Sequence, residues 1–212
     1  MTGLDPRTTA LIVVDMQNDF IHPDGETARW MRKRLEAEGR YVPPDPELLA
    51  DVTAHLNGLI DDARAAGVTV VWARMENTPE TQHRFMAELG WNPCIAGTWG
   101  ARWHEAFAPG DGELVVTKHR HSAFFGTTLD AELRARGIDA VAVTGTATQG
   151  CVESTVRDAC DHDYRTLVVG DCCIQLDQVA HEQALARIAR VFGERTTAAD
   201  LRVLWAGDGV RG

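Results

Sequence analysis

Residues 139–171 read DAVAVTGTATQGCVESTVRDACDHDYRTLVVGD, and their apolar residues follow two different periods in turn. The runs at both ends are short, almost continuously apolar and rich in valine, which is typical of buried strands. Between them, apolar residues recur at helical spacing through Val152, Val156 and Ala159. A strand, a helix and a second strand in this order form a βαβ unit, so the two strands are expected to run parallel.

The same alternation continues on both sides of this unit. Further strands are expected at residues 9–15, 68–74 and 113–118, and further helices at residues 46–66, 127–136 and 178–191. Gly67 stands where a left-handed cap would end the first of these helices. We therefore expect a single domain over residues 1–212, an α/β fold with a doubly wound, mostly parallel sheet and helices on both faces.

Composition excludes several classes of function. The 212 residues include 21 Lys plus Arg against 31 Asp plus Glu, and this net charge of −10 argues against a nucleic-acid surface. The sequence has neither an apolar run of membrane-spanning length nor the pattern of a targeting segment, so a cytoplasmic protein without a membrane partner is expected. The five cysteines include no C-x-x-C pair, which favours free thiols over a disulfide framework.

Two long segments, residues 21–44 and 75–111, interrupt the alternation. Five of the six tryptophans lie in or near them, namely Trp30, Trp72, Trp91, Trp99 and Trp103. Long segments after parallel strands often contact ligands, and the same residue types also form subunit interfaces. Both uses stay open: Trp72 is a candidate substrate contact, and a homodimer or homotetramer is expected.

Three reactive side chains stand at expected strand ends: Asp15, Lys118 and Cys151. Ligands of open α/β sheets bind beyond the carboxyl ends of the strands, so these side chains should meet there. A thiol nucleophile, a carboxylate that takes its proton and an ammonium that favours the charged forms make a workable catalytic set. Taken singly, the aspartate is more typical of a cap and the cysteine of a small buried residue.

These residues lie in stretches that resemble the isochorismatase-like cysteine hydrolases. The matching stretches are LIVVDMQNDF (residues 11–20), TKHRHSAFFGTTLDAELRARGID (117–139) and VTGTATQGCVESTVRDACDHDYRTLVVGDCC (143–173). The resemblance implies that Asp15, Lys118 and Cys151 form a catalytic triad. It also implies a cis peptide between Thr146 and Ala147, and an oxyanion hole made by the amides of Ala147 and Cys151.

The resemblance further implies an amidohydrolase, because family members that cleave an enol ether lack the cysteine found at position 151. The expected substrate is a small amide, ureido or carbamoyl compound, cleaved through a thioester intermediate. The sequence looks most like the ureidoacrylate amidohydrolase branch, with biuret and N-carbamoylsarcosine hydrolases as near relatives. Two alternatives stay open: another small amide, such as a maleamate- or lactam-type substrate, and a non-catalytic member that acts as a binding module.

Further side chains are candidate substrate contacts: Gln17, His119, His121 and Phe125. The two histidines could share one face of an extended segment, but they have no third ligand nearby. The metal-binding residues that related nicotinamidases carry after the second strand are missing from residues 75–78, so no metal or other cofactor is expected. A flavodoxin-like binding protein is disfavoured because no glycine-rich loop follows the first strand.

Overall fold

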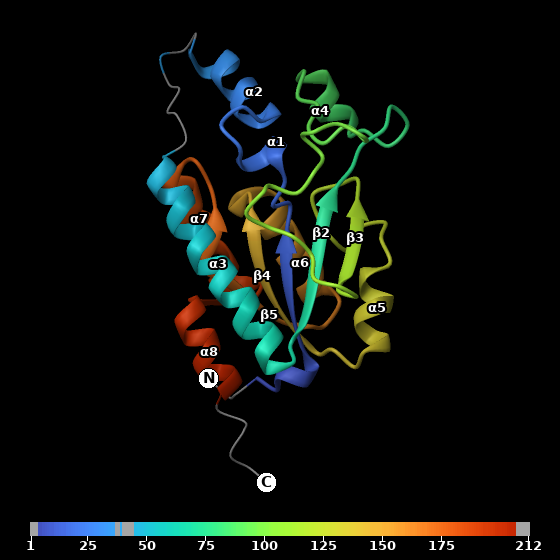
Figure 1. The fold of residues 1–212 in the computed structure, drawn as a ribbon, viewed down its shortest axis with the longest axis vertical. Helices are drawn as coiled ribbons and strands as arrows, with labels where there is room; N and C mark the ends of the chain where they lie inside the picture. The colour runs from blue at the N-terminus through green and yellow to red at the C-terminus, as the bar shows by residue number, and fades with distance from the viewer. Residues whose placement is uncertain (1–3, 37–38, 40–44, 207–212) are drawn as a thin grey trace.

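The computed structural model describes residues 4–36, 39 and 45–206, and within them six strands form one parallel sheet. The strand order is β3-β2-β1-β4-β5-β6 (Figure 1). The strands are β1 (Thr9–Val14), β2 (Thr69–Met75), β3 (Leu114–Lys118), β4 (Ala140–Thr146), β5 (Arg165–Ile174) and β6 (Glu194–Thr196). The expected doubly wound α/β fold is confirmed.

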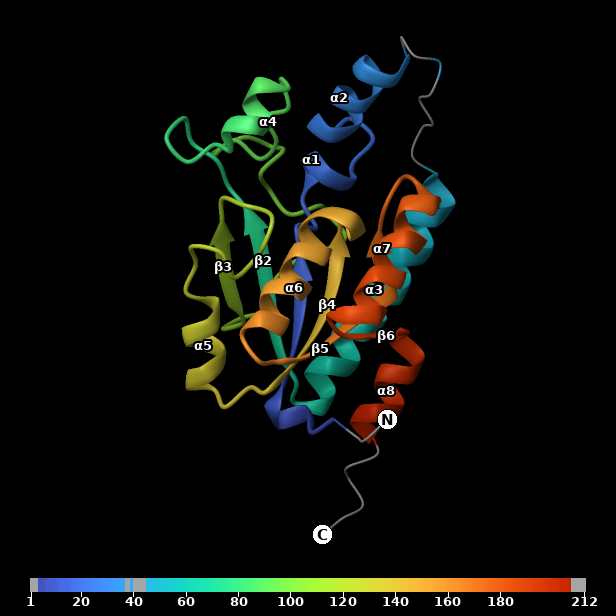
Figure 2. The same ribbon diagram turned by 180° about the vertical axis from the view of Figure 1, so that it is seen from behind.

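Helices cover both faces of the sheet, as Figures 1 and 2 show. On one face lie α3 (Pro46–Ala66) and α8 (Ala198–Ala206). On the other lie α5 (Leu129–Ala135), α6 (Glu153–Asp161) and α7 (Gln178–Val191). All six residues of β1 are buried because this central strand is covered on both sides.

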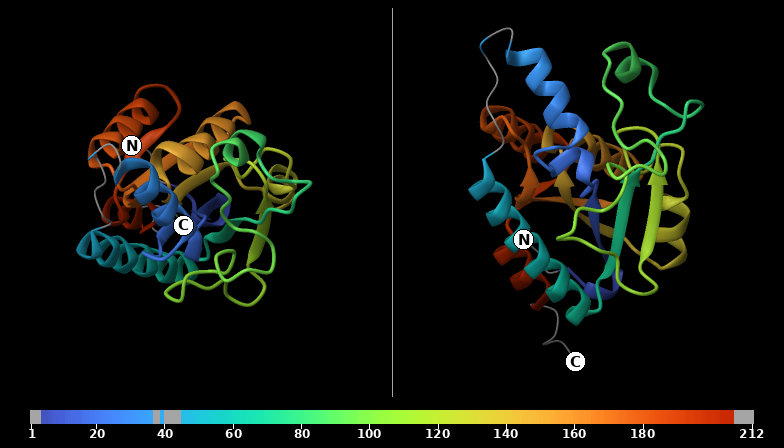
Figure 3. Two further views of the ribbon diagram at one scale, coloured as in Figure 1. Left: turned by 90° about the horizontal axis from the view of Figure 1, so that it is seen from above. Right: turned by 45° about the horizontal axis from the view of Figure 1, so that its top comes forward.

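Three short helices lie beyond the carboxyl ends of the strands, where Figure 3 shows them above the sheet. They are α1 (Asn18–Ile21), α2 (Glu26–Leu35) and α4 (Arg84–Glu88). Helix α1 leads into the first long segment singled out in the sequence, and α2 and α4 lie within the first and the second long segment. Residues 37–38 and 40–44 of the first segment lie outside the described residues. The segments therefore stand on the side of the sheet where ligands bind.

Local sequence signals account for the element boundaries. The Asp45 carboxylate accepts a hydrogen bond from the Glu47 amide at the start of α3, and Gly67 ends that helix with φ of 77°. The helices at residues 46–66 and 178–191 have the expected bounds. Strand β5 continues three residues beyond the expected end at residue 171, since Cys172 and Cys173 are buried in it.

The strand order changes direction between β1 and β4, and these neighbours approach very closely at their carboxyl ends. Gly145 pairs with Val14 and has φ of 106°. A Cβ atom at this position would lie 2.1 Å from the Val14 carbonyl oxygen, so only glycine fits. In open α/β sheets such a switch point is where a ligand-binding crevice forms.

Candidate active site

The carboxylate and the ammonium that the sequence places at strand ends meet at the switch point. Asp15 follows β1 directly, and its backbone amide donates to the Ala73 carbonyl oxygen at 2.8 Å. Its φ of 54° is unusual for a residue other than glycine and turns the chain out of the strand. Lys118 is the last residue of β3, and its Nζ atom lies 2.7 Å from Asp15 Oδ2.

Both members of this ion pair are fully buried. Burying either charge without a partner would be strongly unfavourable. The attraction between the two side chains offsets this cost. The Lys118 ammonium also donates to the Arg120 carbonyl oxygen at 3.1 Å. Burial raises the pKa of Asp15, although the contact with Lys118 opposes this shift. Burial lowers the pKa of Lys118, but its interactions with Asp15 and Cys151 outweigh this effect and leave that pKa raised.

Cys151 lies in a wide helical turn, η3 (Thr148–Val152), which leads directly into α6. The helical segment formed by η3 and α6 therefore begins at Thr148, three residues before Cys151, and the thiol lies near its start. Burial, with a further contribution from the Asp15 charge, raises the pKa of Cys151 to about 12, while Lys118 opposes the shift. The resting sulfur is therefore a neutral thiol rather than a thiolate at neutral pH.

Two other groups surround the sulfur. The Nδ1 atom of His121 lies 3.6 Å from Cys151 Sγ, and burial together with the nearby Lys118 charge lowers the pKa of this imidazole. A neutral His121 can accept a hydrogen bond from the thiol. The peptide bond between Thr146 and Ala147 is cis. Ala147 comes immediately before the turn that carries Cys151, and its carbonyl oxygen accepts hydrogen bonds from the amides of Gly150 and Val152.

A cavity of about 430 Å³ opens over Cys151. Its floor comes from the ends of β4 and β5 and from η3, and its walls come from α1, α2 and the segment after α4. The lining residues are Phe20, Thr27, Trp30, Met31, Trp91, His121, Thr146, Ala147, Gln149, Gly150, Cys151, Ser154, Ile174, Gln175 and Leu176. The expected contact His121 and the expected oxyanion-hole residues Ala147 and Cys151 all line it.

Three aromatic side chains of the wall are not among the predicted substrate contacts. The rings of Trp30 and Trp91 stack with centroids 5.4 Å apart, and Phe20 meets Trp91 edge to face. The tryptophan content of the two long segments indicates possible ligand contacts in the sequence. Irregular segments have no periodicity, however, that indicates which ring faces the cavity. Among the six tryptophans only Trp99 is exposed, so the tryptophan content by itself does not indicate a subunit interface.

The structure places two predicted substrate contacts in the interior. The Gln17 side chain is fully buried, and its amide nitrogen donates to the carbonyl oxygens of Met75 and Ala101, both at 2.8 Å. Its amide oxygen accepts from the Met75 backbone amide, so it holds loops together. Trp72 is buried in the core, where its indole donates to Glu113. Neither side chain lines the cavity over Cys151.

Two more predicted contacts lie outside the cavity lining. His119 is turned away, with its Nδ1 atom 2.7 Å from the Glu76 carbonyl oxygen. The two histidines therefore do not share one face. Phe125 is 64% exposed and does not line the cavity in this chain.

A buried carboxylate that sequence reasoning missed joins the two long segments. The oxygens of Asp19 accept hydrogen bonds from the backbone amides of Glu26 at 3.0 Å and Cys94 at 2.7 Å. Asp19 thus fixes the start of α2 next to the segment that carries Trp91. Its position in the first strand-end stretch was visible in the sequence, but its partners lie far along the chain.

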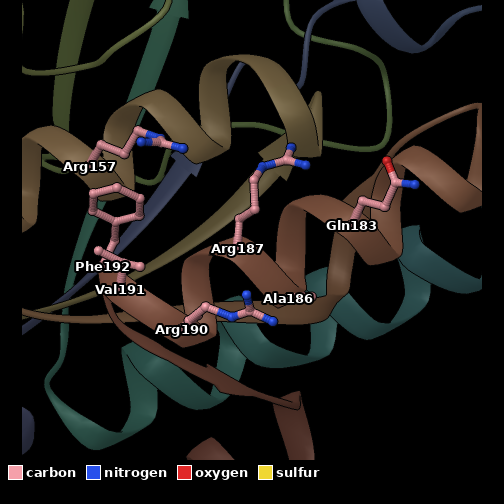
Figure 4. Close-up of a pocket in the computed structure, with 7 residues that line it drawn as sticks. All are labelled: Arg157, Gln183, Ala186, Arg187, Arg190, Val191 and Phe192. Carbon is pink, nitrogen blue, oxygen red and sulfur yellow. The ribbon is translucent and has the colours of Figure 1, made fainter.

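A second hollow, of about 400 Å³, lies between α6 and α7 and is drawn in Figure 4. Two of its arginines, Arg157 and Arg187, hold the Glu153 carboxylate at 2.7 and 2.9 Å. The Arg157 guanidinium also lies over the Phe192 ring. None of the reactive strand-end residues lines this hollow, so the cavity over Cys151 is the candidate active site.

The described part of the chain contains neither a candidate metal cluster nor a candidate membrane span. No three His, Cys, Asp or Glu side chains there are grouped so that they could hold a metal ion. No helix there combines the length and the apolar character that crossing a bilayer requires.

The chain is similar in sequence to proteins named as amidohydrolases. The chain is 32% identical to the ureidoacrylate amidohydrolase RutB of Methylobacterium radiotolerans, over 90% of this chain and 77% of the relative. It is 31% identical to RutB of Caulobacter vibrioides, over 94% and 92% of the two chains.

The chain is also similar in fold to hydrolases of known structure. A cysteine hydrolase from Pseudomonas syringae superposes with a TM-score of 0.82 at 28% identity, over 98% of this chain and 96% of the other. N-carbamoylsarcosine amidase from Thermoplasma acidophilum gives 0.71 at 27% identity, over 97% and 99%. The isochorismatase domain profile matches residues 9–200, and the chain is therefore a member of the isochorismatase family.

Proposed function

We propose that the chain is a cysteine-dependent amidohydrolase that cleaves the carbon–nitrogen bond of a small amide, ureido or carbamoyl compound. The observation that carries the proposal is the buried Asp15–Lys118 pair, 2.7 Å apart, next to the thiol of Cys151, which itself lines the cavity. A buried carboxylate beside a thiol can act as the base that takes the thiol proton and so activates the sulfur as a nucleophile.

The reaction begins with proton transfer. Cys151 rests as a thiol, and the Asp15 carboxylate takes its proton as the sulfur attacks the substrate carbonyl carbon. The raised pKa of Asp15 makes this carboxylate a better base than an ordinary aspartate. Lys118 stays protonated and stabilises whichever of the two partners carries the negative charge.

Attack of the sulfur forms a carbon–sulfur bond and moves the carbonyl electron pair onto oxygen. Backbone amides of Ala147 and Cys151, at the turn before α6, are the proposed donors to this oxyanion. When the oxyanion collapses, the carbon–nitrogen bond breaks and protonated Asp15 gives its proton to the leaving nitrogen. Ammonia or an amine departs, and a thioester on Cys151 remains.

Water then completes the cycle. Asp15 takes a proton from a water molecule that attacks the thioester carbonyl, and the second tetrahedral intermediate releases the acid and the Cys151 sulfur. The proton held by Asp15 returns to the sulfur, so the enzyme ends as it began. One carboxylate serves both half-reactions, as microscopic reversibility allows.

The names of the relatives agree with this chemistry. The curated relatives are ureidoacrylate amidohydrolases, and one structural neighbour is an N-carbamoylsarcosine amidase. A different small amide of the maleamate or lactam type is the alternative substrate, and a binding module without activity is the alternative function. We also propose a cytoplasmic homodimer or homotetramer that needs no metal.

The direct test measures ammonia release over ureidoacrylate, biuret, N-carbamoyl amino acids, maleamate and nicotinamide. Turnover of at least one compound is expected, Cys151→Ala should abolish it, and Asp15→Asn should slow acyl transfer strongly. Circular dichroism of each variant controls for folding. Turnover by Cys151→Ala at the wild-type rate would refute the mechanism, and folded wild-type protein inactive on every amide would favour the binding module.

A further inference from the structure

We propose that the preferred substrates are uncharged amides that carry an aromatic or other apolar group, and not small amides that carry a carboxylate. The inference rests on the proposed function, because it takes Cys151 as the atom next to which the amide carbonyl binds. It concerns the remainder of the substrate, which must lie against the walls of the cavity.

The first observation is the neutrality of the lining. Among the fifteen described residues that line the cavity there is no Lys, Arg, Asp or Glu. The polar members are hydroxyls, amides and His121, whose lowered pKa keeps the imidazole uncharged at neutral pH. A carboxylate that leaves water for such a cavity loses its hydration without gaining a charged partner.

Two neighbouring cations, Lys118 and Arg120, do not line the cavity. The Lys118 ammonium is fully buried against Asp15. The Arg120 guanidinium donates to the backbone carbonyl oxygens of Thr81 and His119. Binding a substrate carboxylate to Lys118 would compete with Asp15 for the ammonium. The exposed Arg34 lies over the Trp30 ring, 5.4 Å from its centroid, and is the cation that the test must exclude.

The second observation is the aromatic wall, which we define as Phe20, Trp30 and Trp91. Each indole N–H of the wall has a partner inside the protein: Trp30 donates to the Leu89 carbonyl oxygen at 3.0 Å and Trp91 to the Thr27 hydroxyl at 3.3 Å. The wall therefore presents carbon surfaces to the cavity. Such surfaces favour apolar and aromatic groups, which stack on them and leave water.

The size and the neighbourhood of the cavity point the same way. A cavity of about 430 Å³ is larger than the smallest amides need, and it can hold a substrate that carries a ring. An adjoining hollow of about 210 Å³ shares Phe20, Ile174 and Leu176 with the cavity and is bordered by the Asp45 carboxylate. A longer apolar group could extend there, whereas an anionic group would meet a like charge.

A matched pair of amides tests the proposal. In 3-phenylpropionamide and succinamate the same two-carbon chain joins the amide to a phenyl ring or to a carboxylate. The expected kcat/KM of the wild-type enzyme is higher for 3-phenylpropionamide by about 100-fold or more. Equal values, or a preference for succinamate, would overturn the proposed specificity while leaving the amidohydrolase function intact.

Variants separate the wall from general effects. Trp91→Leu should lower kcat/KM for 3-phenylpropionamide by about tenfold or more, and Phe85→Leu, an exposed aromatic outside the cavity, is the control that should keep the wild-type preference. Met31→Lys adds a cation to the lining and should raise kcat/KM for succinamate by about tenfold, with Met31→Leu as its control. A loss of succinamate turnover in Arg34→Ala from a wild type that prefers succinamate would place the anion site at Arg34 and refute the proposal.

Binding to Cys151→Ala distinguishes the two ways of failing. Quenching of tryptophan fluorescence should report binding of 3-phenylpropionamide and weak or no binding of succinamate. If this preference appears but the wild-type enzyme hydrolyses neither amide, the specificity of the cavity stands and the proposed hydrolysis fails. If Cys151→Ala binds succinamate as tightly as the phenyl compound, the specificity is wrong whatever the turnover.

Discussion

Replacing Lys118 by methionine removes one charge of a fully buried pair and keeps a side chain of similar length. The Nζ and Oδ2 atoms are 2.7 Å apart, which corresponds to an attraction of about 6 kcal/mol at an effective dielectric constant of about 20. Desolvation offsets part of this attraction, and breaking a buried pair from one side typically costs about 3–5 kcal/mol. We expect Lys118→Met to lower the free energy of unfolding by about 3–5 kcal/mol at pH 8 and to abolish turnover.

Urea unfolding followed by circular dichroism measures the change. The double variant Asp15→Asn/Lys118→Met carries neither charge, so it should be more stable than Lys118→Met alone by about 2 kcal/mol or more. A loss below about 1 kcal/mol in the single variant, or strict additivity in the cycle, would refute the argument that an uncompensated Asp15 charge is the source of the instability.

The same variant has a defined pH dependence. Burial raises the pKa of Asp15 above its unfolded value of about 4, and loss of Lys118 removes the main opposing interaction. Between the two pKa values the folded chain holds a proton that the unfolded chain has lost, so stability falls as the pH rises through this window. The deficit of Lys118→Met relative to the wild type should therefore be smallest near pH 4 and grow toward pH 8.

Further outcomes follow from other parts of the structure. Iodoacetamide should inactivate the enzyme in step with labelling of Cys151, and the rate should rise about tenfold per pH unit from pH 7 to 9 because the thiol pKa is about 12; a plateau near neutral pH, or inactivation that follows labelling of Cys160, would contradict this. Gly145→Ala should lower the melting temperature by several degrees, because its methyl group would overlap the Val14 carbonyl oxygen; an unchanged melting curve would mean that β1 and β4 can separate without loss. Exhaustive chelation should leave the amidase rate unchanged, and restoration by a divalent metal after loss would show otherwise. Sedimentation velocity at micromolar concentration should give a dimer or tetramer, and a monomeric mass would overturn that expectation.

The sheet and the reactive residues could be predicted because their signals are local or repeat along the chain. A buried parallel strand is apolar on both faces, and this makes β1 and β4 legible as short valine-rich runs. Once the strands are known, the common edge of a parallel sheet brings Asp15, Lys118 and Cys151 together without further information. The ion pair of Glu153 and Arg157 is local in the same way, since four residues span about one helical turn.

The walls of the cavity could not be predicted because their contacts join distant irregular segments. Nothing around Gln17 reveals that Met75 and Ala101, 58 and 84 residues away, occupy its amide. Trp72 and Trp91 look alike as residue types, yet one is buried in a strand and the other lines the cavity. Which aromatic residue faces the cavity depends on loop paths, and these carry no period.

The attachments at Gln17 and Asp19 have an evolutionary consequence. Within the described residues, both side chains bond to main-chain groups of the long segments, at Met75, Ala101, Glu26 and Cys94. Main-chain carbonyl oxygens exist whatever residue occupies the position, and main-chain amides exist for every residue except proline. The side chains of these segments can therefore mutate at most positions while the segments stay attached and the Asp15–Lys118 pair stays in place. Such an arrangement lets a lineage try new substrates one point mutation at a time without losing its reaction.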